Sequence, residues 1–303
     1  MPIIRKIRKV LRSKPTIEGA GVHLKRAFGY HHVPQLDPFL LLDDFHSNTP
    51  EEYVKGFPWH PHRGIETITY VLYGKVEHGD SMGNRGVIQA GDIQWMTAGS
   101  GIIHQEMPKG QDDDLMWGFQ LWANLPASQK MMEPRYRDLK AAQIPQVTLG
   151  EGVDVRVISG EVQGVKGPVQ GIVIEPEYLD FEVSAGSSFT YPVGADRTVF
   201  AYVIDGEGYF EQGRDCYAYE VESANYFDLK RECLMGPENL IIFDEGEKIS
   251  VSTEEKPVRF LLVSGRPLKE PVAWYGPIVM NTQAELKTAF DEYEKGTFIK
   301  HDI

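Results

Sequence analysis

Short runs of β-branched and aromatic residues, punctuated by glycine and proline, recur along the whole chain. In the first half they cover residues 67–73, 87–90, 93–96 and 117–122, and Gly74 ends the first run. Side chains two residues apart on a strand point to the same face, so alternating runs of this length are typical of half-buried β-strands. Many short strands at this spacing are typical of sandwiches and barrels, and the pattern therefore predicts an all-β fold.

The second half of the chain repeats the pattern of the first. The phrase at residues 203–206 resembles the phrase at residues 71–74, and both end in glycine. Self-similarity is typical of duplicated units, so we expect two copies of one β-barrel unit that have diverged. The strands expected in the second copy are residues 171–174, 200–204, 239–243 and 259–263.

Residues 126–145 differ from both halves, because they carry charged and polar residues without strand alternation and are bounded by proline. Such a segment is typical of an interdomain linker, here with a short helix or turn. The sequence therefore predicts a first domain over residues 1–125, a linker over residues 126–145 and a second domain over residues 146–303.

A single helix is expected near the C-terminus. Thr282 and Glu285 have the spacing of a capping box, in which each side chain bonds the backbone N–H of the other residue. Apolar residues then recur from Leu286 at helical spacing, which gives the helix one apolar face. Gly296 is the expected stop signal.

Composition and charge exclude several classes of protein. The chain has 44 acidic residues against 31 lysines and arginines, and the net charge of −13 argues against binding to nucleic-acid phosphates. The basic run over residues 5–14 is interpreted as a solvated strand edge or terminal segment rather than as a nucleic-acid arm. No run of about 18 apolar residues and no secretory signal is present, and two cysteines, Cys216 and Cys233, are too few for a disulfide framework. We therefore expect a cytoplasmic monomer that contacts neither membranes nor nucleic acid directly.

The candidate chemistry lies in two alternate-residue pairs. His60 and His62 are two residues apart, as are His104 and Glu106, so each pair lies on one face of its strand. Two such strands in one barrel aim the four groups at one point, which predicts a metal site. The nine histidines stand at positions 23, 31, 32, 46, 60, 62, 78, 104 and 301, so a histidine site belongs to the first half.

The spacing does not determine which carboxylate is the ligand or which metal ion binds. Glu66 lies four residues after His62, and on an unbroken strand it faces the same way, so it is a ligand in place of Glu106 or a partner of a ligand histidine. Three imidazoles and one carboxylate suit Fe, Mn, Co, Ni, Cu or Zn, and the ligand types do not choose among them. A site with an open position admits water, O2 or a chelating substrate, whereas a closed site is structural.

At these residues the chain resembles the pirin family of the cupin superfamily. The stretches that carry the resemblance are residues 36–45, 60–67, 90–108 and 276–282. The resemblance implies a bicupin, with two antiparallel β-barrels and one mononuclear metal ion, usually iron, in the first barrel. The metal ligands that it implies, in preference to Glu66, are His60, His62, His104 and Glu106.

The resemblance also implies two classes of function. Some pirin-like proteins are quercetinases, which cleave flavonols with O2 and release carbon monoxide. Others are iron-dependent, redox-responsive binding proteins that act as transcriptional co-regulators or as modulators of a metabolic enzyme. The expected partner is accordingly a flavonol-like aromatic substrate or another protein.

For a dioxygenase, Glu106 is expected to take the proton of the flavonol 3-hydroxyl, since metal coordination lowers the pKa of that hydroxyl. A flat aromatic ligand also needs an apolar pocket beside the metal. The candidates for the walls of this pocket are Trp59, Trp95, Met96 and Met107, and the favoured alternative for any single one of them is plain barrel core.

Overall fold

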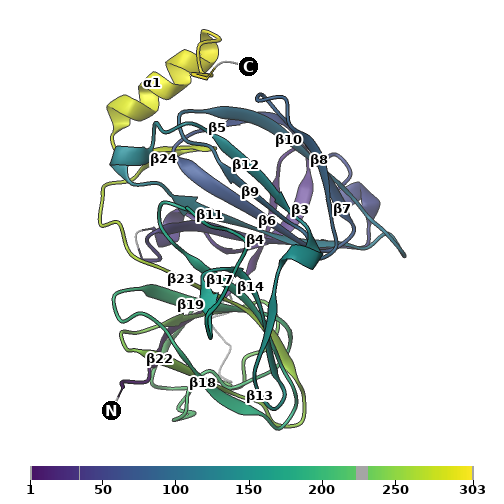
Figure 1. The fold of residues 1–303 in the computed structure, drawn as a ribbon, viewed down its shortest axis with the longest axis vertical. Helices are drawn as coiled ribbons and strands as arrows, with labels where there is room; N and C mark the ends of the chain where they lie inside the picture. Colours follow the sequence, from purple (N-terminus) through teal and green to yellow (C-terminus); the bar gives the residue numbers. More distant parts are fainter. Residues whose placement is uncertain (1, 34, 223–230, 302–303) are drawn as a thin grey trace. The chain divides into compact units, whose positions relative to one another are not determined.

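The computed structural model describes residues 2–33, 35–222 and 231–301. Across these residues the chain is built of β-strands with a single α-helix near the C-terminus, which confirms the predicted all-β class (Figure 1). Two compact units are formed, and each combines segments that are distant in the sequence. The first unit contains residues 14–143 and 268–303, and the second unit contains residues 1–13 and 144–267.

The first unit contains a larger and a smaller antiparallel sheet. The strands of the larger sheet are β2 (Lys14–Glu18), β3 (Val22–Phe28), β4 (Phe39–Ser47), β6 (Ile65–Tyr73), β9 (Ile93–Thr97), β11 (Met116–Asn124) and β12 (Arg135–Leu139), in the order β12-β9-β6-β11-β4-β3-β2. The strands of the smaller sheet are β5 (Phe57–His62), β7 (Lys75–Asp80), β8 (Arg85–Gln89) and β10 (Ile102–Lys109), in the order β5-β10-β7-β8. Short 3-10 turns are η1 (Tyr30–His32), η2 (Pro50–Glu52), η3 (Ala127–Gln129) and η4 (Ala141–Gln143).

Apolar side chains pack the two sheets of the first unit against each other. Leu24, Phe45 and Val71 from the larger sheet share a buried cluster with Val76 and Ile88 from the smaller sheet. Burial of this apolar surface holds the sheets face to face. The side chains that point inward from both sheets therefore meet in one interior.

The tail of the chain adds a hairpin and the helix to the first unit. The elements are β24 (Ala273–Tyr275), β25 (Ile278–Met280) and α1 (Gln283–Glu294). The predicted capping box is present, since Thr282 Oγ1 accepts from the Glu285 N–H and the Glu285 carboxylate accepts from the Thr282 N–H. Leu286 and Ala289 pack α1 on the hairpin, and the helix ends before Gly296, as predicted.

The second unit is built around an eight-stranded sheet. Its strands are β1 (Ile7–Arg12), β13 (Gln146–Gly150), β14 (Val153–Ser159), β17 (Glu177–Val183), β19 (Thr198–Gly206), β20 (Glu220–Glu222), β21 (Asn239–Phe243) and β23 (Val258–Gly265), in the order β13-β14-β17-β23-β19-β21-β1-β20. Two further pairs are β15 (Glu161–Val162) with β16 (Val165–Lys166), and β18 (Ser188–Pro192) with β22 (Lys248–Ser252). All of these pairs are antiparallel except β1 with β20.

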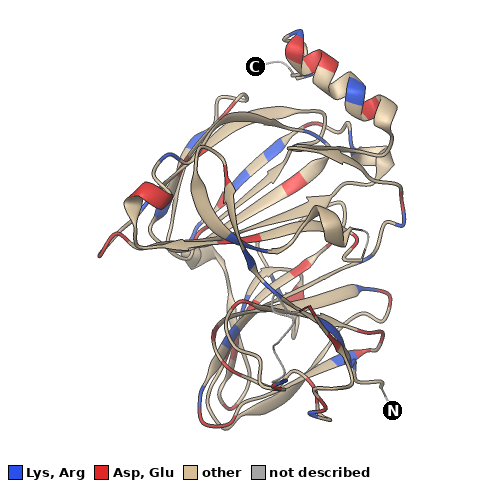
Figure 2. Ribbon diagram, turned by 180° about the vertical axis from the view of Figure 1, so that it is seen from behind, with Lys and Arg blue, Asp and Glu red and all other residues tan. Residues whose placement is uncertain are grey.

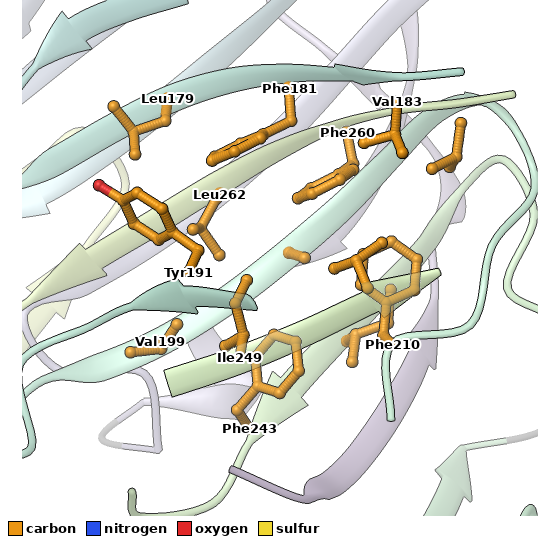
Figure 3. Close-up of a cluster of buried hydrophobic side chains, with 14 of the residues drawn as sticks. Leu179, Phe181, Val183, Tyr191, Val199, Phe210, Phe243, Ile249, Phe260 and Leu262 are labelled. Atoms are coloured by element: carbon orange, nitrogen blue, oxygen red, sulfur yellow. The ribbon is translucent and has the colours of Figure 1, made fainter. Parts of the chain in front are cut away.

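The interior of the second unit is filled by apolar side chains (Figure 3). Phe181 and Phe260 stack with their ring centres 5.1 Å apart, and Phe210 meets Phe260 edge to face at 5.0 Å. Phenyl rings packed in this way contribute apolar burial together with favourable ring contacts. The second interior is therefore a hydrophobic core.

The units differ from the expected domains 1–125 and 146–303 at both ends of the chain. β1 pairs with β21, so the N-terminal strand belongs to the second unit, and residues 268–303 belong to the first unit. Backbone pairing satisfies the N–H and C=O groups of β1 whatever its side chains are. Its sequence therefore carries no sign of the partner strand.

Two local expectations were wrong. The segment 126–145 contains the expected short turns, η3 and η4, but it is not only a linker, because it also contains β12, which pairs with β9 in the larger sheet. Only Leu139 of β12 is buried, so the strand is held by backbone pairing and lacks the alternation that would reveal it. Conversely, Ile172 and Ile174 lie in a turn rather than in a strand, although both are buried.

The expectation that the basic run at the N-terminus is solvated was wrong for Arg5, which has a structural role in the second unit. Arg5 is buried, and its guanidinium donates to the backbone carbonyls of Gly194, Arg197, Asp244 and Gly246. In the view of Figure 2, basic and acidic residues are interspersed along the ribbon.

Among the described residues, α1 is the sole α-helix and it is too short and too polar to cross a membrane.

Candidate metal centre

The three histidines of the two predicted pairs meet in the first unit. β5 and β10 are antiparallel neighbours, and His104 lies directly opposite His60 in their register, while His62 lies opposite Ile102. Cross-strand partners point to the same face of a sheet. The pairing therefore brings the three imidazoles together, with ring centres 4.4 to 4.9 Å apart.

Backbone carbonyls decide which ring nitrogens face the cluster. His60 Nδ1 lies 2.8 Å from the Pro58 carbonyl oxygen, and His62 Nδ1 lies 3.0 Å from the Pro277 carbonyl oxygen. A carbonyl only accepts, so both Nδ1 atoms carry the proton and both Nε2 atoms present a lone pair. These lone pairs meet in the cluster, where His60 Nε2 is 3.0 Å from both His62 Nε2 and His104 Nε2.

This arrangement fits a metal ion. Facing lone pairs repel one another unless a cation lies between them. Nitrogens that each lie about 2.0–2.1 Å from one ion, at right angles to each other, are about 3 Å apart. Burial lowers the pKa of all three imidazoles, and for His62 and His104 the pKa falls well below the usual range. Neutral imidazole is the form that ligates metals, so the cluster is already in the binding state at neutral pH.

Glu106 is buried on β10, two residues after His104. Its Oε1 accepts from Thr69 Oγ1 and its Oε2 accepts from Gln120 Nε2, both at 2.9 Å. Trp122 Nε1 donates to Gln120 Oε1 at 3.0 Å and so fixes the amide with its NH2 group toward the carboxylate. A carboxylate has about four lone-pair sites, so these two bonds leave acceptor capacity on both oxygens.

Glu66, the alternative carboxylate, lies in a different sheet from His62. Gly64 separates β5 from β6 with a φ of +78°, and a Cβ there would lie 2.0 Å from a backbone oxygen. The chain turns at this glycine from the smaller sheet into the larger one, so the alternation that starts at His62 does not extend to Glu66. The carboxylate of Glu66 instead accepts from Trp95 Nε1 at 3.1 Å and from Thr97 Oγ1 at 2.8 Å.

A cavity of about 840 Å³ opens beside His60 and His62. Trp122 meets His62 edge to face at 5.0 Å, Trp274 follows at 6.0 Å, and Tyr30 lies 5.5 Å beyond Trp274. The row runs from the buried His62 to the exposed Tyr30. A cavity of this size suits one small molecule, and the rings can hold a flat aromatic ligand against the histidines.

One side of the same cavity carries a compact ionic group. Arg26 donates from Nε and Nη2 to the two oxygens of Asp43 at 2.8 and 2.7 Å, and its Nη1 lies 2.9 Å from Glu18 Oε1. Burial raises the pKa of Asp43 to about 6, although the Arg26 guanidinium opposes this. Above that pH two carboxylates share one guanidinium, so this wall disfavours anionic ligands.

Two family models match this chain, Pirin over residues 21–123 and the Pirin C-terminal cupin domain over residues 178–299. The chain belongs to the pirin family. This confirms the resemblance and the expected bicupin with a C-terminal helix.

Known pirins and one solved enzyme are similar to the chain over almost its full length. The Pirin-like protein of Caulobacter vibrioides is 41% identical over 98% of this chain and 100% of that protein. Pirin of Homo sapiens is 38% identical over 95% of this chain and 92% of that protein. The crystal structure of quercetin 2,3-dioxygenase from Acinetobacter baumannii matches with a TM-score of 0.84 at 32% identity, and the match covers 98% of this chain and 99% of that one.

The four side chains expected to wall the pocket of this pirin do not line its cavity. Trp59 and Met107 each adjoin a candidate ligand on a strand, so alternation points them to the opposite face, and Trp59 is 53% exposed. Trp95 is buried and donates to Glu66. Met96 packs in an apolar cluster below the surface. Trp95 and Met96 are core residues, as the alternative expected. The wall role was wrong because it selected large residues near the ligands without regard to strand alternation.

The residues that do surround the pirin centre were missed at the sequence level. Gln120 and Trp122 form an alternate-residue pair on β11, and that spacing was an available signal. Trp274 and the Pro277 carbonyl come from the tail, and no local pattern connects them with His62. These residues reach the site only because the tail folds back onto the first unit.

Proposed function

We propose that this pirin is a metal-dependent flavonol dioxygenase, with iron held by His60, His62, His104 and Glu106. The observation that carries the proposal is the row of aromatic rings that ends at converging Nε2 lone pairs. The similarity to the quercetin 2,3-dioxygenase of Acinetobacter baumannii supports the same reaction. Iron is proposed because the metal of pirins is usually iron, and the other redox-active ions Mn, Co, Ni and Cu suit the same ligands.

The aromatic row would position the substrate. Flavonol rings stack on Trp122 and Trp274, and the end of the row directs the 3-hydroxyl toward His60 and His62. Aromatic pairs of this kind contribute about 0.5–1.5 kcal/mol beyond burial.

Glu106 would act as the proton acceptor. A bound metal ion lowers the pKa of a coordinated hydroxyl and supports electron transfer to O2. The proton of the 3-hydroxyl passes to a Glu106 oxygen, while Thr69 and Gln120 keep the carboxylate in place. The overall reaction takes up one O2, opens the central ring and releases one of its carbons as carbon monoxide.

The test is turnover by purified protein loaded with Fe(II). We expect quercetin to disappear with uptake of O2 and release of carbon monoxide in equal amounts. Glu106→Gln should abolish turnover, whereas Glu66→Gln should retain it, because Glu66 bonds Trp95 and Thr97 instead of the cluster. Trp274→Ala should raise KM for quercetin about tenfold, which corresponds to about 1.4 kcal/mol.

Metal content decides how a negative result is read. Elemental analysis of each variant separates loss of the ion from loss of the base. Absence of O2 uptake with several flavonols, in protein that holds one equivalent of Fe, Mn, Co or Ni, would overturn the dioxygenase proposal. A protein partner captured under only one redox condition would then favour a redox-responsive binding protein.

A further inference from the structure

His78 and Asp80 on β7 lie behind the candidate ligands of β10. In the register of these strands, Asp80 lies opposite His104 and His78 lies opposite Glu106. Cross-strand partners share a face, and both β7 side chains are buried. A third alternate-residue pair therefore faces the interior that holds the histidine cluster, and the proposed reaction does not use it.

His104 differs from the other two histidines of the cluster. The Nδ1 atoms of His60 and His62 have carbonyl partners, but His104 Nδ1 is buried and has no partner among the described residues. His78 Nδ1 is a second buried nitrogen without a partner in the described part of the chain. An unpaired buried polar atom costs about 1–3 kcal/mol. Metal-ligating histidines almost always donate their other N–H to a partner.

The two unpaired nitrogens belong to neighbouring rings. The centres of the His78 and His104 rings are 5.4 Å apart. At this separation, facing nitrogens can share a hydrogen bond directly or through one buried water. Pairing them removes two unsatisfied atoms at once.

The directions of the surrounding hydrogen bonds agree with this pairing. Asp80 accepts from the backbone N–H groups of Met82 and Asn84 at 2.9 and 3.0 Å, and from Asn84 Nδ2 at 2.9 Å. These donors hold the carboxylate 3.2 Å from His78 Nε2, so Nε2 is the donor of that pair. His78 Nδ1 is thereby left as an acceptor, which is what His104 Nδ1–H requires.

We propose that His78, fixed by Asp80, accepts the hydrogen bond of His104 Nδ1–H and so sets the tautomer and orientation of this metal ligand. His78 is a positioning residue because it acts through His104, and the inference rests on the proposed metal site. The Tyr136 ring stacks on His78 with centres 4.5 Å apart and holds the plane of the imidazole. All three histidines then direct an Nε2 lone pair into the cluster.

Two substitutions test the hydrogen-bond acceptor of His78 separately from its ring. His78→Phe keeps a stacked ring and removes the acceptor, whereas His78→Asn places an amide oxygen near the former Nδ1 position. We expect His78→Phe to weaken binding of Co(II) or Fe(II) about 10–100-fold in competition with a chelator, and His78→Asn to recover most of this loss. His46→Phe is the matched control, because His46 stacks on Trp117 at 4.1 Å and is exposed away from the cluster.

A spectroscopic readout distinguishes positioning from general destabilisation. In the Co(II)-loaded protein, each ligand histidine with a bonded Nδ1–H should give a slowly exchanging, paramagnetically shifted proton resonance. We expect three such resonances in the wild type and in His46→Phe, and two in His78→Phe. The melting temperature of each metal-free variant controls for folding.

The outcomes separate this inference from the proposed function. Failure of the wild type to bind any divalent metal would overturn the metal site itself. Wild-type binding together with equal affinity and three resonances in His78→Phe would overturn the role of His78 alone. Loss of affinity in His78→Asn as large as in His78→Phe would also count against an acceptor role.

Discussion

Lys130 offers the sharpest test of how the first unit is held together around its centre. The side chain is 2% exposed, and Nζ donates to the Gly64 carbonyl at 2.9 Å, to Asn124 Oδ1 at 2.7 Å and to the Val279 carbonyl at 3.0 Å. The acceptors come from the turn after β5, the end of β11 and the tail. Lys130→Met keeps most of the volume but leaves three buried acceptors unpaired, at about 1 kcal/mol or more each. We expect the free energy of unfolding to fall by about 3 kcal/mol near pH 6, where the ammonium form of Lys130 supplies all three N–H donors.

The loss should depend on pH. Burial lowers the pKa of Lys130 to about 7, whereas a lysine in an unfolded chain titrates near 10.4. Between these values the unfolded chain binds a proton that the folded chain does not, so Lys130 makes wild-type stability rise with pH across this window. Methionine has no such contribution. The difference in free energy of unfolding between the wild type and Lys130→Met should therefore grow from pH 7 to pH 9, by up to about 1.4 kcal/mol per pH unit.

The positions of tryptophan make the measurement specific. The five tryptophans stand at 59, 95, 117, 122 and 274, all within the first unit. Tryptophan fluorescence during urea unfolding thus follows the first unit, while far-UV circular dichroism follows both. Lys140→Met is the matched control, because Lys140 bonds Asp92 and a carbonyl but is 51% exposed, and should cost less than about 1 kcal/mol. Two outcomes would refute the reasoning. One is an equal loss of unfolding free energy in Lys130→Met and Lys140→Met, and the other is a difference between wild type and Lys130→Met that does not change between pH 7 and pH 9.

Three further predictions address other parts of the molecule. Phe260→Ala removes a stacked ring from the core of the second unit and should cost about 3–5 kcal/mol, seen by circular dichroism without a shift of the fluorescence transition. Thr282→Ala removes the helix cap and should cost about 1 kcal/mol, with faster hydrogen exchange over residues 283–294 and no change in the second unit. Chelation of a metal that had been present at 100 times its Kd should lower the free energy of unfolding of the first unit, measured by tryptophan fluorescence, by about 2.7 kcal/mol. Added metal should restore it. A transition that is indifferent to the chelator would mean that no metal stabilises the first unit.

Strands were predictable where a run of β-branched and aromatic residues is buried, and one strand was missed where little of it is buried. The segment 239–243 coincides with β21, and 67–73 lies within β6, because each buries apolar residues in a regular register. β12 buries little, so its membership of the larger sheet is decided by backbone hydrogen bonds that leave no trace in side-chain type. The turn at Ile172 and Ile174 shows the converse, since apolar residues are buried there without forming a strand.

The same limit applies to the candidate site. The histidine pairs were predictable because alternation on one strand is a local property. Rejecting Glu66 on physical grounds needs the backbone turn at Gly64, which appears only in the folded chain. The tautomer of His62 depends on the Pro277 carbonyl, 215 residues away. Contacts of that kind are set by the path of the chain, and spacing cannot reveal them.

The two interiors explain why the candidate metal site lies in the first unit. In the second unit, phenyl rings such as Phe181 and Phe260 fill the space, and no histidine occurs in residues 1–13 or 144–267. In the first unit, imidazoles and a carboxylate occupy the interior, and every buried polar atom there needs a partner. Carbonyls supply partners for two Nδ1 atoms, and we assign His78 to the third. With that tautomer of His104, the converging Nε2 lone pairs have no donor among the described residues, and a cation between them would be a suitable partner.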